Sequence, residues 1–548
     1  VLVSLVGPPG KITREKKGEL RLRRAILLLL CLCLILPAAG CGMGYKADGE
    51  FTYLLPGNLN SLDPQTASGA AAQLVIGSLF EGLCRIDSEG EVVPGVAERW
   101  ESRNNDTEFT FHLRRDAQWS DGSPVTAQDF LFAIQRALQP ETGTPAVDDL
   151  FAIQGARAIY HGEAGMEALG VTVEDGHTLV FRLEKSVPDF PALTAAMHYM
   201  PCSQSYFEES LGHYGLSSQY LLTNGPFALA SVYAWDTDSG ERKVSLVRSS
   251  TYRGEEQVQP SSVTYLIDYD SAWIQDPVAT LTAGEADVLQ VTEQEARAAE
   301  EAGCGILTLE DAVTGLLLNP QSEKLESVYL REVLFKTLDR QDLLSRREDA
   351  SQAQGIMAAC ITYGGEPYYQ EGAAAYPQQD DSVTQGLSGL LDGLDLEDMP
   401  SVTVICPDDA ESVNVANGFL VAWNSQLGTA FNIEPLPQDE LQRRVAAGEY
   451  EAALYTLRAG GTTPYAVLKS FESHASPALL NSAAYDEALH SLTFDLASYQ
   501  SLEQRLLEEY VFYPLFQDVT YYAMNPKVRG IRICPDGSVD LTAARKRG

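Results

Sequence analysis

The chain has 548 residues and a formal net charge of -37 at pH 7. It is too long for one hydrophobic core, so two or three domains are expected. A surface this acidic repels nucleic acid, which excludes a role that depends on binding it. The cysteines beyond residue 50 are scattered without CxxC spacing. We therefore expect buried free thiols and no disulfide framework or zinc site.

The first 40 residues predict a secretion signal. A basic lead is followed by an aliphatic run over 25–36, and small residues then precede Cys41. The apolar run is about a dozen residues, whereas a membrane-spanning helix needs ~20. The string AAGC resembles the bacterial lipobox, which implies that Cys41 is lipidated and that acyl chains hold the mature chain on a membrane. The alternative is a plain secretory signal with an incidental cysteine.

Further along the chain, hydrophobic periodicity predicts strands and helices. Alternation predicts a strand at 109–113, WSDGSP at 119–124 predicts a turn, and 125–138 predicts a helix that Thr126 caps together with Asp129. Strands are also expected at 179–183, 243–248, 262–267 and 286–291, helices at 328–344 and 499–511, and a long surface connection at 371–400. Strands and helices mix without a strict βαβ order, which favours α/β lobes with mixed sheets.

Eight sequence blocks identify a family. They are SLDP at 61–64, LFEGL at 79–83, VPGVAERWE at 93–101, FTFHLRRDAQWSDGSPVTAQDFLFAIQR at 109–136, LGVTVEDGHTLVFRLEKSVPDF at 169–190, TNGPFAL at 223–229, GEADVL at 284–289 and LREVLFKTLDRQDLL at 330–344. In this order they closely resemble the family-5 extracellular solute-binding proteins of ABC transporters, which include the oligopeptide-binding proteins. Within the blocks, Trp119, Asp121, Gly122 and Pro124 are interpreted as a turn and its packing, not as ligand contacts.

The resemblance implies an α/β fold of the two-lobe, periplasmic-binding-protein-like class, with mixed sheets, a hinge between the lobes and an extra inserted domain. The implied division is a signal peptide with lipobox at 1–40, a lipid-anchored tether at 41–50, a first lobe from 45–78, 215–318 and 520–548, an inserted domain at 79–214, and a second lobe at 319–519. A ligand that contacts both lobes favours the closed state over the open one.

In peptide-binding members, an aspartate in a stretch of the kind RAGWCADYxxP meets the amino terminus of the peptide. The matching stretch here is 450–468, and its gapless alignment puts Gly460 at the aspartate, Leu457 at the tryptophan, Leu454 at the arginine and Arg458 at the cysteine. A shifted alignment of RAGG also lacks the aspartate. A buried ammonium without a counter-charge costs several kcal/mol. Either the amine is met elsewhere or the ligand is not an ordinary free peptide.

The resemblance also suggests ligand-binding residues. The candidates are Leu59, Asn60, Ser61, Tyr455, Leu457, Arg458 and Gly460. LNS at 59–61 matches a strand that pairs with the ligand backbone. Arg458 could bind a carboxylate or phosphate, or it could point into solvent or neutralise an acidic neighbour. Tyr363, Tyr368, Tyr369 and Tyr376 either border the pocket or belong to a surface loop.

No catalytic or cofactor motif accompanies these blocks: the sequence has no GxSxG, HExxH, P-loop or dinucleotide fingerprint, and its histidines lack metal-ligand spacing. We expect that the protein is not an enzyme and that it binds no cofactor and no metal. The expected function is a lipid-anchored extracellular protein that captures an oligopeptide or peptide-like solute and delivers it to an ABC importer permease. Alternatives are a binder of a nickel chelate, haem or glycan, a peptide-signal receptor and, remotely, a secreted hydrolase.

The expected partners are the permease subunits, the solute, and the membrane through the N-terminal lipid. The expected location is the extracellular face of the bacterial cytoplasmic membrane, or the periplasm of a Gram-negative cell. We expect a monomer that binds no nucleic acid.

Overall fold

A computed structural model describes residues 45–46, 49–55, 59–145, 147–236, 243–254, 257–267, 276–347, 351–369, 400–427, 431–473, 475, 477–534 and 537–547. The predicted signal segment and Cys41 lie outside these residues, as do Tyr376 and all but the last residue of the connection at 371–400.

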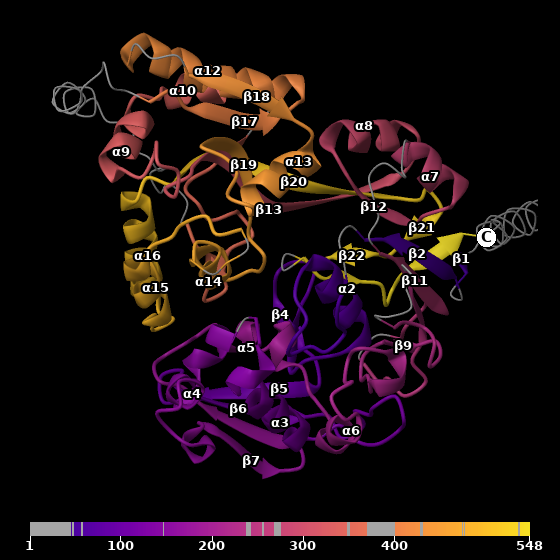
Figure 1. Ribbon diagram of the computed structural model, residues 1–548. Coiled ribbons are helices and arrows are strands. Elements are labelled where there is room, and N and C mark those ends of the chain that lie inside the picture. The colour runs from indigo at the N-terminus through magenta and orange to yellow at the C-terminus, as the bar shows by residue number, and fades with distance from the viewer. Residues whose placement is uncertain are drawn as a thin grey trace, which may run out of the picture.

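A large mixed sheet runs across the molecule (Figure 1), with the strand order β18-β17-β19-β13-β20-β12-β2-β11-β10-β9, and β14 pairs with β20. Its strands are β2 Glu50–Leu54, β9 Phe227–Leu229, β10 Lys243–Arg248, β11 Ser262–Leu266, β12 Val288–Val291, β13 Gly305–Leu318, β14 Ser351–Gln352, β17 Thr403–Pro407, β18 Asn432–Leu436, β19 Ala452–Arg458 and β20 Phe512–Met524. The long antiparallel pair β13–β20 joins the two ends of this sheet, and its register shifts twice, between Leu309 and Ala312 and between Thr314 and Gly315. Such irregularities bend a strand pair and increase its local twist.

A second, antiparallel sheet forms what we call the lower module, at the bottom of Figure 1. It contains β5 Ala97–Arg103, β6 Glu108–Leu113, β8 Thr178–Arg182 and β7 Val171–Asp175, with α3 Ala127–Ala137, α4 Ala156–Tyr160, α5 Phe190–Leu193, α6 Gln204–Glu209 and the 3-10 turns Pro140–Thr142, Val147–Ala152, Met166–Ala168, Met197–Tyr199 and Ser218–Tyr220. The predicted strands at 109–113 and 179–183 are confirmed as β6 and β8. The predicted cap is confirmed too, because the Asp129 carboxylate accepts hydrogen bonds from the Thr126 N–H (2.7 Å) and hydroxyl (2.9 Å).

The upper module consists of β17–β19 and the helices around them, at the upper left of Figure 1. These are α9 Val328–Lys336, α10 Arg340–Leu344, α12 Ala410–Leu427, α13 Gln438–Ala446, α14 Pro464–Lys469, α15 Ala483–His490 and α16 Leu496–Glu508. The segment predicted to be helical over 328–344 is helical, but it forms two helices, α9 and α10. Asp339 starts a second helix there, because its carboxylate accepts hydrogen bonds from the N–H groups of Gln341 and Asp342. The helix predicted at 499–511 is α16, which ends before Tyr510, whose φ is +50°.

The remaining elements are β1 Tyr45–Lys46, α2 Ala70–Leu79, β3 Cys84–Ile86, β4 Val92–Pro94, α7 Pro277–Ala283, α8 Glu293–Glu301, β15 Thr362–Tyr363, β16 Glu366–Pro367, β21 Val528–Arg529, β22 Arg532–Ile533, β23 Val539–Asp540 and β24 Arg545–Arg547. The strands predicted at 243–248, 262–267 and 286–291 are confirmed as β10, β11 and β12. The α/β class with mixed sheets is likewise confirmed. The thiols of Cys84, Cys202, Cys304 and Cys406 are free and buried, as expected, Cys534 is also buried, and Cys360 is half-buried.

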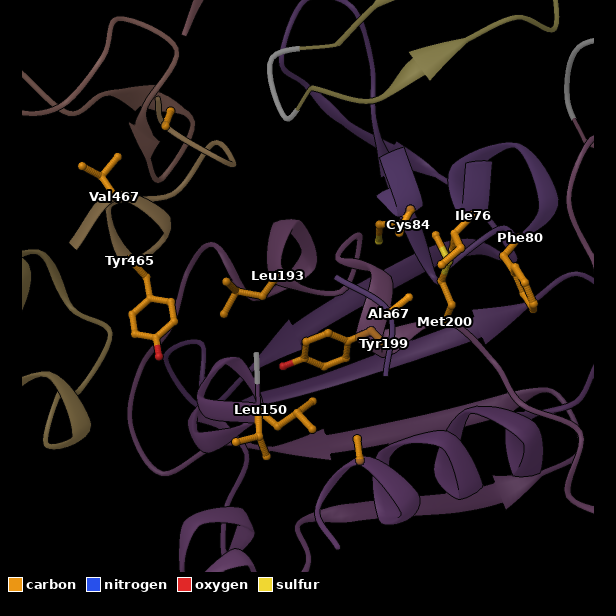
Figure 2. Close-up of a cluster of buried hydrophobic side chains, with 14 of the residues drawn as sticks. Ala67, Ile76, Phe80, Cys84, Leu150, Leu193, Tyr199, Met200, Tyr465 and Val467 are labelled. Atoms are coloured by element: carbon orange, nitrogen blue, oxygen red, sulfur yellow. The ribbon is translucent and has the colours of Figure 1, made fainter. Parts of the chain in front are cut away.

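One hydrophobic core is shared by the lower module and part of the upper module. Figure 2 shows Tyr465 and Val467 on α14 at one side and Leu193, Tyr199 and Leu150 at the other, all within that core. Of the helices in the described part of the chain, none is long and apolar enough to cross a membrane.

Candidate functional site

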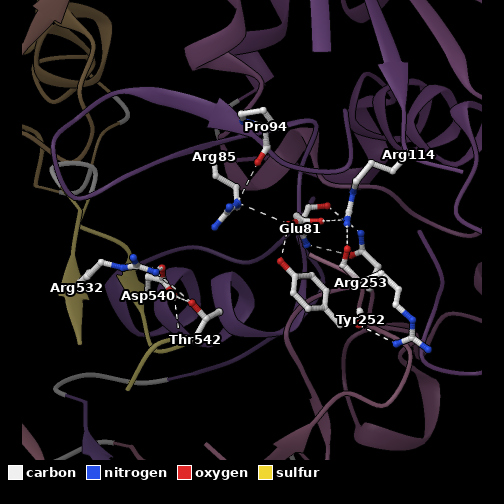
Figure 3. A network of polar contacts seen from close by, with 10 residues as sticks. Glu81, Arg85, Pro94, Arg114, Tyr252, Arg253, Arg532, Asp540 and Thr542 are labelled. Carbon is white, nitrogen blue, oxygen red and sulfur yellow. Dashed lines mark hydrogen bonds and ion pairs between the residues drawn. The ribbon is translucent and has the colours of Figure 1, made fainter. Parts of the chain in front are cut away.

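The sequence blocks meet around the buried carboxylate of Glu81 (Figure 3). Arg114 Nη2 lies 2.5 Å from Glu81 Oε2, and the Tyr252 hydroxyl donates to Oε1 at 2.7 Å. The Glu81 main chain is also bonded, since its N–H donates to Asn224 Oδ1 (3.1 Å) and its carbonyl accepts from Asn224 Nδ2 (2.9 Å). LFEGL, the 109–136 block and TNGPFAL are therefore held together by a structural network.

The WSDGSP segment has the structural role that we predicted for it. Trp119 is buried, and the Asp121 carboxylate accepts a hydrogen bond from the Ser123 N–H at 2.8 Å. Gly122 has a φ of +89°, a conformation that glycine adopts without strain. These residues build a turn, so the specificity for a ligand has to be set elsewhere.

A second network links SLDP to the lower module. Arg136 Nη2 on α3 bonds Asp63 and also Gln65 Oε1 (2.6 Å), and its guanidinium lies over the rings of Phe207 and Tyr214, at 4.5 and 5.3 Å. Gln65 Nε2 in turn donates to the carbonyls of Met200 (2.9 Å) and His198 (3.3 Å). The network thus fixes the segment at 198–200.

That segment borders a cavity of about 380 Å³ between the lower and upper modules. Most of its walls come from four stretches, 64–77, 144–149, 192–200 and 460–469, and Ile86 and Ser538 complete the lining. The first three stretches belong to or adjoin the lower module, and the fourth is α14 with the loop before it. Cavities of this size bind small molecules, and their few buried polar groups set orientation and specificity. We call it the central cavity.

Three ionisable side chains converge on the central cavity. His198 Nε2 lies 3.1 Å from Asp149 Oδ2, and Lys469 reaches the cavity from the end of α14. Burial raises the pKa of the Asp149 carboxyl, but the charges of Lys469 and His198 outweigh burial and hold that pKa below its usual value. Lys469 and Asp149 thus interact electrostatically across the two modules.

Some polar atoms in this cavity lack hydrogen-bond partners. Asp149 Oδ1, Lys469 Nζ and Thr144 Oγ1 are buried and have none among the described residues. Buried polar groups are nearly always hydrogen-bonded, and leaving one unpaired costs about 1–3 kcal/mol. Such atoms are available to form hydrogen bonds with a molecule that enters the cavity.

Another polar contact holds the modules together beside the cavity. The Gly364 N–H donates to the Asp189 carboxylate, at 2.6 and 2.7 Å from its two oxygens. Burial raises the pKa of Asp189, and the hydrogen bond from Gly364 only partly offsets this. Asp189 immediately precedes α5 of the lower module, whereas Gly364 lies between β15 and β16.

Of the candidates from the sequence, Gly460 lines the central cavity, with a φ of +65°. Leu59 packs against the hydrophobic core, Asn60 is exposed, and the Ser61 hydroxyl accepts a hydrogen bond from the Asp63 N–H at 3.0 Å. These three residues precede the stretch that begins the cavity wall at Pro64 but are not part of that wall.

Tyr455, Leu457 and Arg458 lie at a different cavity, of about 400 Å³, which we call the side cavity. Leu457 is only 4% exposed and belongs to the hydrophobic core. The Arg458 guanidinium hydrogen-bonds the Thr520 hydroxyl and lies 3.5 Å from Asp311 Oδ1, so it pairs with an acidic neighbour on β13. The structure therefore separates Gly460 from the other three candidates in the same stretch.

The candidate tyrosines have structural contacts. The Tyr368 and Tyr369 hydroxyls both donate to the buried carboxylate of Glu503 on α16, and the Tyr363 ring packs against Tyr499 at 6.1 Å. Sequence reasoning missed Asp149, His198 and Lys469. The one signal for Lys469 was its place directly after the stretch aligned to the peptide-binding motif, whereas no local pattern marked Asp149.

Among the described residues, no group of three or more His, Cys, Asp or Glu side chains could hold a metal ion.

Comparisons with known proteins place the chain among transport proteins. Residues 91–477 match "Bacterial extracellular solute-binding proteins, family 5 Middle". The chain is 32% identical over 295 residues to the "Probable deoxycholate-binding periplasmic protein YgiS" of Escherichia coli (strain K12), a match that spans only 53% of each chain. It is 23% identical over 530 residues to the "Dipeptide-binding protein" of Lactococcus lactis subsp. cremoris (strain MG1363), covering 92% of this chain and 96% of that one.

A solved structure shares the fold. The Haemophilus influenzae OppA complex with RPPGFSPFR superposes with a TM-score of 0.70 at 24% identity, over 92% of this chain and 100% of that chain. The predicted two-lobe class of periplasmic-binding-protein-like folds is confirmed by this likeness.

Proposed function

The chain belongs to family 5 of the bacterial extracellular solute-binding proteins, and from this premise we propose that it captures an oligopeptide or peptide-like solute and delivers it to an ABC importer permease. Family 5 proteins are transport binding proteins and not enzymes. The proposed molecule is a monomer that is anchored through a lipid on Cys41 to the extracellular face of the bacterial cytoplasmic membrane, or that works in the periplasm of a Gram-negative cell. Its proposed partners are the solute and the permease subunits.

The observation that carries the proposal is the central cavity. It lies between two modules that are joined through the β13–β20 strands, and buried polar atoms at its walls lack partners. A solute bound there touches both modules at once. Its contacts exist in full only when the modules are together, so binding shifts the population toward the closed arrangement. The permease then recognises closure and not the solute.

We propose for this chain the division into lobes that the family resemblance implies. The first lobe comprises 45–78, 215–318 and 520–548, with an inserted domain at 79–214, and the second lobe comprises 319–519. In this division Asp149 and His198 belong to the inserted domain and Lys469 to the second lobe.

Native mass spectrometry of the purified protein tests the proposal. The protein is isolated without unfolding and then gently denatured, so that any co-purified solute is released. Release of a series of short peptides of different lengths supports oligopeptide uptake. Release of one sugar, chelate or haem, with no peptide, contradicts it. A protein that emerges empty is titrated with tri-alanine and with a nonapeptide, and failure to bind either also contradicts the proposal.

One observation favours a second candidate, an apolar carboxylate such as a bile acid. The 32% identical relative is named as a probable deoxycholate-binding protein, and the cavity here combines the apolar Leu193 and Met197 with the cation Lys469. The same mass spectrum decides between the two candidates, because a bile acid and a peptide differ in mass and fragmentation.

A further inference from the structure

The central cavity contains a lysine, Lys469, whose buried ammonium has no hydrogen-bond partner among the described residues. We propose that Lys469 binds a free carboxylate of the transported solute and makes that carboxylate a requirement for tight binding. The inference rests on the proposed function, in that the central cavity is taken as the solute site, and it adds the chemical group that the site recognises. It also assigns a binding role to a side chain outside the aligned motif residues.

Lys469 differs from the other buried or half-buried lysines of the described chain. Half-buried Lys336 and Lys546 each form a direct ion pair, with Glu332 at 2.5 Å and Asp287 at 2.8 Å, and even the exposed Lys324 pairs with Glu451 at 2.5 Å. Lys469 Nζ is buried without a hydrogen bond, and its nearest described aromatic contact is the Tyr465 ring, at 5.6 Å from the centroid. A lysine retained for stability would be paired as the other three are.

The neighbours of Lys469 do not supply hydrogen-bond acceptors for its ammonium group. The Asp149 carboxylate interacts electrostatically with the Lys469 ammonium and so partly offsets the unfavourable burial of that charge. The side chain that lies against the Asp149 carboxylate, however, is His198, whose Nε2 is 3.1 Å from Oδ2. An ammonium group donates up to three hydrogen bonds and is costly to bury unpaired. A ligand carboxylate that enters the cavity supplies acceptors for Lys469, while Asp149 Oδ1 remains able to accept an N–H or O–H of the same ligand.

The charge of the site favours a carboxylate over a phosphate. Lys469 is one cation, and Asp149 is held ionised beside it. A carboxylate carries one negative charge and is repelled by Asp149 less strongly than a phosphate dianion would be. The carboxylate can come from a peptide C-terminus or from a bile acid, and the experiment separates these sources.

The test compares acids with their uncharged analogues on the full-length protein at pH 7. Isothermal titration measures tri-alanine against tri-alanine amide, and deoxycholate below its micellar concentration against deoxycholamide. The variants are Lys469→Met, which keeps the length of the side chain, Lys469→Arg, which keeps the charge, and Lys527→Met as a control at an exposed lysine outside the cavity. Thermal melting verifies that each variant is folded.

The proposal predicts that in at least one pair the wild type binds the acid at least about tenfold more tightly than the amide, as loss of a charge-assisted hydrogen bond implies. Lys469→Met abolishes this preference, Lys469→Arg retains most of it, and Lys527→Met leaves it unchanged. Equal affinity for acid and amide in both pairs, an unchanged preference in Lys469→Met, or no binding of any of the four compounds overturns the proposal.

Failure of the proposed function looks different. Binding of tri-alanine and its amide with equal affinity leaves peptide capture standing and removes the role of Lys469. Binding of deoxycholate alone, with a preference that depends on Lys469, confirms the carboxylate site and contradicts peptide capture.

Discussion

Two carboxylates of this protein, Glu81 and Asp149, differ in how fully their oxygens are hydrogen-bonded. Glu81 receives hydrogen bonds on both oxygens from Arg114 and Tyr252, and its main chain is bonded to Asn224. One oxygen of Asp149 lies 3.1 Å from His198 Nε2, while its other oxygen is buried and has no hydrogen bond among the described residues. Both sites are rich in charge, but only one is complete without a ligand.

The difference indicates how the two regions are used. Both carboxylate oxygens of Glu81 are hydrogen-bonded, and its network joins three sequence blocks and holds the fold, so it identifies the family but not the solute. The cluster at the central cavity joins two modules and leaves polar atoms that can bind a solute. Single buried atoms without a partner occur elsewhere too, Arg114 Nε among them, but Asp149, Lys469 and Thr144 place three of them at one cavity.

The largest expected effect comes from breaking the saturated site. Glu81→Ala leaves the Arg114 charge buried and unpaired, and loss of one partner of a buried pair costs about 3–5 kcal/mol. The free energy of unfolding, measured by urea denaturation, should fall by this amount. Glu98→Gln is the control: the exposed pair of Glu98 with Arg99 contributes about 0–1 kcal/mol. Similar losses in both variants would remove the distinction between the two carboxylates.

A smaller and pH-dependent effect is expected at Asp149. Its pKa is lowered in the folded protein, so its ionised form stabilises the fold above the usual aspartate pKa of about 3.9, and this stability is lost as the pH falls through the lower folded value. Asp149→Asn should cost about 1–3 kcal/mol at pH 7, the range for hydrogen bonds to charged groups.

Urea denaturation at pH 7 and pH 3 checks this sign. The difference in stability between wild type and Asp149→Asn should shrink at the lower pH. Asp116→Asn, at an exposed position, is the matched control and should show no such convergence. A difference that stays constant between the two pH values contradicts the charge interaction with Lys469.

A third prediction sharpens the contrast between Arg458 and Lys469. Arg458 is paired with Asp311 and Thr520, and 48% of its side chain is exposed. Arg458→Gln should therefore cost no more than about 1 kcal/mol of stability and change solute affinity by less than about twofold. Titration calorimetry with the solute identified by mass spectrometry measures this. A loss of solute affinity as large as that of Lys469→Met would indicate that the solute binds beside β19 and not in the central cavity.

The smallest effect concerns the contact that closes the modules beside the cavity. Burial raises the pKa of Asp189 in the closed arrangement, so closure is accompanied by proton uptake and is favoured as the pH falls toward the usual aspartate pKa of about 3.9. Solute affinity of the wild type should thus rise a few-fold, relative to Asp189→Asn, between pH 7 and pH 5. A constant affinity ratio between these two proteins contradicts the prediction.

Local patterns in the sequence predicted local structure well. The alternation at 109–113 and the Thr126–Asp129 cap depend on neighbours in the chain, and both are present. The same reasoning did not separate α9 from α10, because the hydrophobic periodicity continues past Asp339. The Asp339 side chain caps the N-terminus of α10 and so begins a new helix. The resemblance supplied the two-lobe architecture that periodicity alone could not.

The site was harder to predict because its parts are far apart in the sequence. Gly460 was found by alignment and does line the cavity, but Arg458, two residues earlier, turns toward β13. Asp149, His198 and Lys469 come from three separate elements, and only folding brings them together. Nothing in the sequence near Lys469 reports that its ammonium would be buried without a partner.

The most direct test of the central claim is a crystal structure of the protein with its co-purified solute, or with tri-alanine where none is retained. Our account predicts that the solute fills the central cavity between the two modules, with a carboxylate oxygen within hydrogen-bond distance of Lys469 Nζ. A solute seated instead in the side cavity, against Tyr455 and Arg458, would contradict it.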